Sequence, residues 1–268
     1  MTGPALEAAR QVRLSDGVLD YALRRSRRAR HLRVTVHPER GVVVTLPARG
    51  SVGAVDDFLR EREGWLRRHL DAHERQRARA AAHRPFGPDG RMLFRGEVHR
   101  VRMERAEPGT RRSRVLRVGG DDLDELVLVV ARADRRPPAR VLEAWLRERA
   151  SAAIADEIER HAAPLGVEPV AVSLRDPRTR WGSATRTRRL SFSWRLVLAP
   201  PRALETVVVH ELAHLRVFGH GPAFWATVAA RMPDHREWRR WLHDHSLELH
   251  APLDGAGEVD PPESQLAI

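Results

Sequence analysis

The amino-acid sequence predicts an α+β protein in which a β-rich N-terminal domain is followed by an α/β domain. Two observations support this. Short segments rich in β-branched residues, separated by Gly, Pro and Asp turns, dominate the chain up to residue 134. Longer segments with apolar residues three and four apart, typical of helices, dominate the rest. A chain of 268 residues with 42% hydrophobic residues can bury a substantial core as one large domain or two modest ones.

The predicted domains are residues 17–134 and residues 137–246. The boundary lies in the sequence RRPPAR, where Pro138 suits the first turn of a following helix. Residues 1–16 are expected to be a disordered N-terminus. Residues 247–268, rich in Pro, Gly and acidic side chains, are expected to be a disordered tail.

In the first domain, Arg30 to Ala48 is predicted to form a hairpin, because two β-branched segments flank the turn sequence PERG. A helix is predicted to begin after Ser51 as N-cap and to end near Arg77, with apolar residues at helical spacing. Three further strands are expected in the segments RMLFRGEVHRVRME, SRVLRVGG and DELVLVVARA.

The second domain is predicted to begin with a helix from Ala139 to about Ala163, which has one apolar face. Two strands, EPVAVSLRD and RLSFSWRLVLA, are expected on either side of a turn in RTRWGSAT. A helix from Pro201 or Arg202 to near Gly219 follows, and two closing helices are expected in GPAFWATVAARMP and DHREWRRWLHDH.

The helix that begins at Pro201 carries two histidines and a glutamate in an otherwise apolar segment, VVVHELAHL. His210 and His214 are four residues apart, so their imidazoles share one helix face and can hold one zinc ion. Glu211 is placed to take a proton from water without ligating the metal. His220 is the best candidate for the third ligand, because Gly219 can adopt the left-handed conformation that ends a helix and turns the chain back. The sequence thus predicts one Zn²⁺ per chain.

The following motifs occur in this order along the chain: WGS at Trp181, Gly182 and Ser183, WRL at Trp194, HELAH at His210, then His220 after five intervening residues, and FW at Phe224. With LRRSRRARHLRVTV near the start, this pattern resembles the YgjP-like family of predicted bacterial metal-dependent hydrolases, relatives of the SprT-like and other small gluzincin-type zinc peptidases. The usual cysteine after WGS is Ala184 here, and an aromatic residue common before the histidines is Thr206.

The resemblance implies a zincin-like metallopeptidase domain with His210, His214 and His220 as ligands and Glu211 as catalytic acid and base. We therefore predict a zinc-dependent hydrolase that cleaves peptide bonds in peptide or protein substrates. The alternatives are a metal-dependent phosphohydrolase acting on nucleotides, of nucleoside triphosphate pyrophosphatase type, and a nucleic-acid-associated module with a structural metal site. Trp181, Gly182 and Ser183 are candidates for a substrate rim that an extended peptide joins as a strand, or else for a turn that packs the core.

The amino-acid composition indicates which classes of partner the protein can bind. The 47 basic residues are all arginine and leave a net charge of +11, which favours weak binding of polyanions or nucleic acid through the Arg-rich N-terminal half. Arginine-only usage is also what GC-rich codons produce, and the run RRSRRAR from Arg24 to Arg30 is either a solvated face or a phosphate-binding patch. The chain has no cysteine for disulfides or thiol chemistry, and no signal-peptide core or long apolar run. A cytoplasmic protein with no membrane contact is expected.

Overall fold

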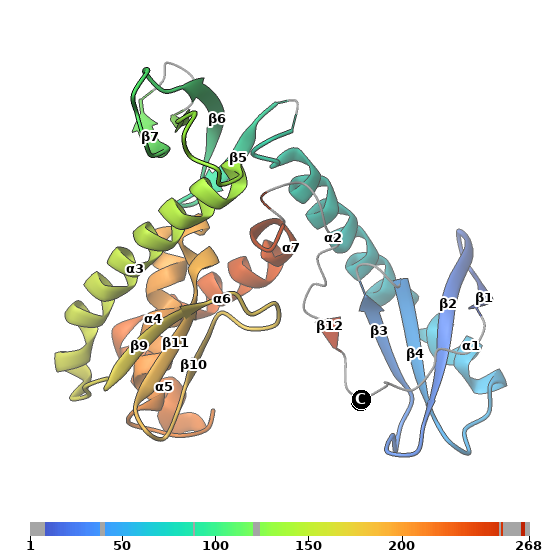
Figure 1. Cartoon of the computed structure of the whole chain (residues 1–268). Coiled ribbons are helices and arrows are strands. Elements are labelled where there is room, and N and C mark those ends of the chain that lie inside the picture. Colours follow the sequence, from blue (N-terminus) through green and yellow to red (C-terminus); the bar gives the residue numbers. More distant parts are fainter. Residues whose placement is uncertain are drawn as a thin grey trace. The chain divides into compact units, whose positions relative to one another are not determined.

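The computed structural model describes residues 9–37, 41–87, 89–119, 124–251, 253 and 264–265. The chain forms two compact units, one of residues 1–77 with 260–268 and one of residues 78–259 (Figure 1). We call them unit 1 and unit 2. No helix among the described residues is long and apolar enough to cross a bilayer.

Unit 1 contains a sheet with the strand order β1-β2-β4-β3-β12. Its strands are β1 (Ala9–Leu14), β2 (Gly17–Ser26), β3 (Arg33–His37), β4 (Gly41–Pro47) and the short β12 (Ser264–Gln265). The predicted hairpin is confirmed, since β3 and β4 pair antiparallel, while β2 and β4 run parallel. Successive side chains of a strand point to opposite faces of the sheet, and on one face Leu23, Val34 and Val44 pack into a core with Leu59 and Leu66 from the helices.

Two predictions for unit 1 need correction. The N-terminal segment 1–16 is not disordered throughout, because β1 pairs along its whole length with β2 and buries Val12; residues 1–8 lie outside the described residues. The predicted single helix is two helices, α1 (Gly53–Glu61) and α2 (Glu63–Ala82). They are separated at Arg62, whose φ of −108° and ψ of 15° leave the helical conformation, and the side chain of Ser51 does not cap α1.

Unit 2 begins with a sheet in the order β5-β6-β8-β7, built from β5 (Arg91–Phe94), β6 (Glu97–Arg105), β7 (Arg114–Val118) and β8 (Glu125–Val130). The segment expected to be one strand is therefore a hairpin, with its turn at Arg95 and Gly96. The backbone N–H groups of these two residues donate to the carbonyls of Val197 and Leu198. A side chain at Gly96 would come within 2.6 Å of Pro200, so glycine is required at this close approach.

The predicted domain boundary at residues 134–137 is wrong, because these contacts tie the four-stranded sheet to the segments that follow that boundary. The four-stranded sheet shares one core with the long helix α3 (Pro138–Leu165), the 3₁₀ helix η1 (Trp194–Leu198) and α4 (Pro201–His214). Leu126 and Leu128 from the sheet, Leu142 and Leu146 from α3, and Trp194 are all fully buried in it. The sheet therefore belongs with the C-terminal unit.

The remainder of unit 2 consists of a small sheet and short helices (Figure 1). Strands β9 (Ala171–Arg175), β10 (Gly182–Ala184) and β11 (Arg189–Ser193) are ordered β10-β11-β9, so that β10 is an edge strand. The predicted WGS turn is thus the start of a strand. The strand expected over RLSFSWRLVLA ends at Ser193, whose hydroxyl accepts a hydrogen bond from the Arg195 N–H and starts η1.

The C-terminal helices are α5 (Pro222–Arg231), α6 (His235–Asp244) and α7 (Ser246–Leu249). The two predicted closing helices are confirmed, whereas the prediction that the chain is disordered from residue 247 is wrong for the first residues of that segment. Leu247 and Leu249 are buried, and Glu248 pairs with His83. Residues 250–251, Leu253 and β12 are also described, and the remainder of the predicted tail lies outside the described residues.

Candidate active site

Helix α4 carries both histidines and the glutamate of the HELAH sequence. Pro200 precedes its first turn and Pro201 stands in it, where a missing N–H costs nothing. From Ala203 to Ala213 the helix is buried except at His210, because it packs against α3, α5, α6 and β10. The half-buried His210 and His214 therefore mark the one face of this segment that opens outward.

His220 reaches the same place from the turn after α4. The helix ends at His214, earlier than predicted, and Gly219 has the expected left-handed conformation with φ of +88°. The ring centroids of His214 and His220 are 4.8 Å apart, and those of His210 and His220 are 5.2 Å apart. One ring nitrogen from each of the three histidines lies within 4.8 Å of the others.

This arrangement fits a zinc ion. The Nε2 atoms of His210 and His220 are 3.3 Å apart. Two nitrogens bound tetrahedrally at about 2.0–2.1 Å from zinc would be separated by roughly 3.3–3.4 Å. Burial, followed by the neighbouring histidines, lowers the pKa of His210 to about 3. Its imidazole is therefore neutral at physiological pH, as a metal ligand must be.

Aromatic side chains from α5 support the three imidazoles. Phe224 is fully buried, stacks on the His214 ring at 4.3 Å between centroids and meets the His210 ring edge-on at 4.9 Å. Trp225 lies 5.7 Å from the rings of both His210 and His220. The FW sequence is thus a packed support that holds the rings in place.

The side chain of Glu211 lies against β10. Its side chain lies so close to Gly182 that a Cβ atom at that position would be 2.6 Å from Glu211 Oε1 and 2.7 Å from its Cγ. Burial raises the pKa of Glu211 to about 7, against an opposing effect of the positive charge of Arg180. A carboxylate with this pKa can both accept and release a proton near neutral pH.

The WGS residues predicted as a substrate rim form the edge of the small sheet beside this glutamate. Trp181, Gly182 and Ser183 are all half-buried. The rings of Trp181 and His250 pack together with 4.4 Å between their centroids, and the backbone carbonyl of Trp181 accepts a hydrogen bond from the Ser193 N–H. Among the described residues β10 pairs only with β11, so its outer edge has no strand partner. The strand lies alongside α4.

The family model for the YgjP-like metallopeptidase domain matches residues 30–245. The chain belongs to the YgjP-like metallopeptidase family. No curated protein matches the chain. Among solved structures, the crystal structure of the metallopeptidase zymogen abylysin of Pyrococcus abyssi matches with 20% identity, over 33% of this chain and 91% of that one, with a TM-score of 0.31. A structural similarity of this size supports no conclusion about the present chain.

Two other groups of side chains that could ligate a metal occur among the described residues of this YgjP-like protein, and in both of them arginines pair with carboxylates. Glu157, His161 and Glu205 lie together between α3 and α4. Arg160 holds Glu157 and Arg202 holds Glu205. In the second group, formed by Glu97, His99 and Asp124, the carboxylate of Asp124 is paired with Arg117 at 2.6 Å. The three-histidine group is therefore the better candidate for the metal of a metallopeptidase.

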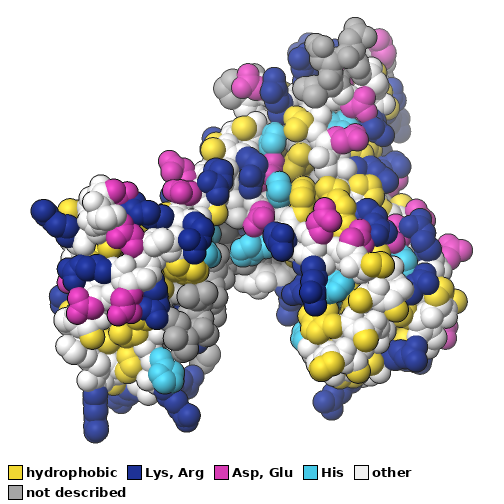
Figure 2. Space-filling model, turned by 180° about the vertical axis from the view of Figure 1, so that it is seen from behind, with side chains coloured by type: hydrophobic (Ala, Val, Ile, Leu, Met, Phe, Trp, Pro, Cys, Tyr) yellow, Lys and Arg dark blue, Asp and Glu magenta, His cyan; other side chains and the backbone are white. Residues whose placement is uncertain are grey.

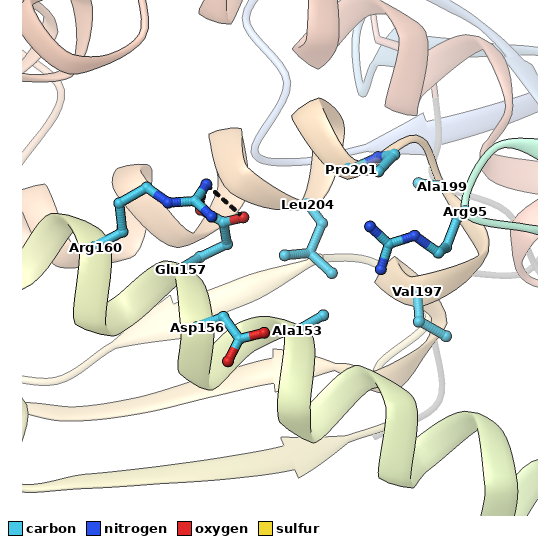
Figure 3. A pocket seen from close by; sticks show the side chains of 9 residues that line it. All are labelled: Arg95, Ala153, Asp156, Glu157, Arg160, Val197, Ala199, Pro201 and Leu204. Atoms are coloured by element: carbon cyan, nitrogen blue, oxygen red, sulfur yellow. Dashed lines mark hydrogen bonds and ion pairs between the residues drawn. The ribbon is translucent and has the colours of Figure 1, made fainter.

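A cavity of about 110 Å³ also opens between α3, η1 and the first turns of α4 (Figure 3). Its lining includes Arg95, Asp156 and the ion pair of Glu157 with Arg160, but none of the three histidines. The cavity is therefore separate from the candidate active site of the YgjP-like domain.

Sequence reasoning missed one residue of the site's surroundings. His235 lies on an Arg-rich helix, yet it is buried and stacks on Trp225 at 5.3 Å between ring centroids. Arg239 lies over the same tryptophan at 4.4 Å. His235 is buried by a tertiary contact, since this first residue of α6 packs against Trp225 of α5. The periodicity of the α6 sequence does not reveal such a contact. His243, on the same helix, is exposed.

Proposed function

We propose that the protein is a zinc-dependent peptidase that holds its metal with His210, His214 and His220 and uses Glu211 as general base and acid. The observation that carries the proposal is the convergence of three imidazoles, two of them on the same helix as the buried Glu211 carboxylate. The chemistry that a bound zinc ion supplies is Lewis acidity, which polarises a carbonyl and lowers the pKa of water.

The residues of the chain account for the proton transfers. With a pKa near 7, the Glu211 carboxylate accepts a proton from the attacking water and then returns it to the leaving amine nitrogen. Gly182 confines this carboxylate, because the side chain packs directly on its Cα. Glu211 is thereby held in one position for both transfers.

The free edge of β10 provides a place for the substrate. An extended peptide can add to such an edge through backbone hydrogen bonds, which bind it largely irrespective of sequence. Because Gly182 lies in β10 and touches Glu211, a peptide paired with this strand passes the glutamate. Trp181, Gly182 and Ser183 are then the rim of the substrate cleft.

The rival phosphohydrolase chemistry is less well supported by the same residues. Phosphoryl transfer commonly relies on paired metal ions held by carboxylates. In the described part of the chain, the carboxylate-containing groups that could hold a metal are engaged by arginines, as shown above for Glu205 and Asp124. A structural metal site is also disfavoured, since it has no use for an adjacent general base.

The direct test is to incubate the zinc-loaded full chain with a mixed peptide library and, in parallel, with nucleoside triphosphates. We expect cleavage of peptides and a loss of about 10²–10⁴-fold in Glu211→Gln, which keeps the shape of the side chain but removes its basicity. Hydrolysis of nucleoside triphosphates without cleavage of any peptide would establish the phosphohydrolase and exclude the proposal.

A further inference from the structure

Unit 1 contains a basic pocket at the point where β2 leads into β3. Its volume is about 380 Å³. The lining residues come from the end of β2, the connecting loop, β3 and the neighbouring strand β4, and they are Arg24, Ser26, Arg28, Ala29, Arg30, His31, Leu32, Arg33 and Thr45. Four arginines and a histidine therefore line one concave surface with no acidic side chain in it.

The four arginines of this pocket have no carboxylate partner among the described residues. Within the described residues, Arg24, Arg28, Arg30 and Arg33 form no ion pair, whereas elsewhere in unit 1 Arg67 pairs with acidic side chains. In Figure 2, dark-blue arginine side chains project from the lower end of unit 1, at the left of the view. Concentrated positive charge without internal compensation attracts anions.

Arg24 gives the pocket a fixed inner wall. Its Nη2 donates to the Thr45 hydroxyl at 3.0 Å, which orients the guanidinium across the strands. Its Nε is buried and makes no hydrogen bond to any described residue. A buried donor without a partner is costly, particularly on a charged group. An anionic oxygen in the pocket would supply the missing acceptor.

From this pocket we infer that unit 1 binds the phosphate backbone of single-stranded nucleic acid. A single phosphate is satisfied by one or two guanidinium groups, so four arginines suit a ligand with closely repeated phosphates. The apolar lining consists only of Ala29 and Leu32. The imidazole of His31 is the one ring in the lining on which an unpaired base can stack, so recognition is mainly through phosphates and depends little on base sequence.

The inference is independent of the proposed peptidase activity and is tested by binding alone. The probe is a 5′-fluorescent 20-nucleotide oligonucleotide of mixed sequence, and its anisotropy is measured with the zinc-loaded full chain over a range of salt concentrations. The pocket variant replaces Arg28, Arg30 and Arg33 by glutamine. All three are exposed, and the half-buried Arg24 is left in place so that the fold is preserved.

A matched control replaces Arg68, Arg75 and Arg77 by glutamine, which removes the same charge from exposed positions on α2. We expect the pocket variant to bind roughly tenfold more weakly or worse, and its slope of log K against log salt to fall by about 2, since each single-strand phosphate contact contributes about 0.7. The control should bind almost as wild type does.

Three results would overturn the inference. The first is equal weakening in the pocket variant and the control, which would show diffuse attraction by net charge. The second is no binding of the oligonucleotide by the wild-type chain at low salt. The third is tighter binding of a singly phosphorylated peptide than of the oligonucleotide, lost in the pocket variant, which would make a phosphoprotein the occupant.

Discussion

Replacing Gly182 by alanine should disable the general base without touching the metal ligands. The added Cβ would lie 2.6 Å from Glu211 Oε1, 2.7 Å from Cγ and 2.9 Å from Cδ. Carbon atoms in ordinary contact are about 3.5–4.0 Å apart, so the glutamate side chain has to move by roughly 0.8 Å or more. His210 and His214 lie on another face of α4 and should keep their positions.

The size of the effect follows from this displacement. A misplacement of about 1 Å at a reacting group costs on the order of 10²-fold in rate, which corresponds to about 2.7 kcal/mol of activation free energy. Crowding a packed position also lowers the free energy of unfolding by about 1–3 kcal/mol. Gly182→Ala should therefore fold, bind zinc as wild type does, and show a kcat about 100-fold lower.

The assay measures kcat on a peptide cleaved by the wild-type chain, together with zinc per chain by elemental analysis. Gly221→Ala is the matched control, because a Cβ at Gly221 meets no atom within 4 Å and its φ of −73° suits any residue. Wild-type kcat in Gly182→Ala would refute the reasoning. Equal losses of kcat in the two variants would do so as well.

Three further substitutions test the packing around the site. His235→Phe should reduce the pH dependence of the free energy of unfolding. Burial and nearby arginines lower the pKa of His235, so the folded chain binds this proton less readily than the unfolded chain does. In denaturant titrations at pH 7.5 and 5.5, the wild type should therefore lose more stability at the lower pH than the variant. Phe224→Ala should cost about 3–5 kcal/mol of unfolding free energy and weaken zinc binding, because the ring supports His214, and calorimetry of both processes would show it. Glu205→Ala should cost about 1–3 kcal/mol in chemical denaturation, since it leaves the buried His161 Nε2 without its partner at 2.9 Å; an unchanged midpoint would contradict this.

Local features were readable from the sequence where one short segment determines them. The helical spacing of His210 and His214 and the left-handed turn at Gly219 depend on neighbouring residues, and both the helix and the turn occur as predicted. The place of the four-stranded sheet in unit 2 depends instead on the contact of Gly96 with Pro200, which are far apart in the chain. Periodicity cannot reveal such a contact.

The steric role of the WGS glycine was hidden for the same reason. As a sequence, Trp-Gly-Ser is equally compatible with a turn and with a rim. Only the packing of β10 against α4 shows that Gly182 leaves room for Glu211. A glycine near a catalytic motif, inside what proves to be a strand, is the signal that could have suggested a close approach of another group.

The central claim is that three histidines bind the metal while Glu211 transfers protons. It is tested most directly by measuring zinc per chain and zinc affinity in wild type, Glu211→Gln, His220→Ala and the exposed-site control His243→Ala. We predict one zinc per chain with nearly unchanged affinity in wild type, Glu211→Gln and His243→Ala, and a strong loss of affinity in His220→Ala. Full zinc binding by His220→Ala, or loss of zinc from Glu211→Gln, would contradict the assignment.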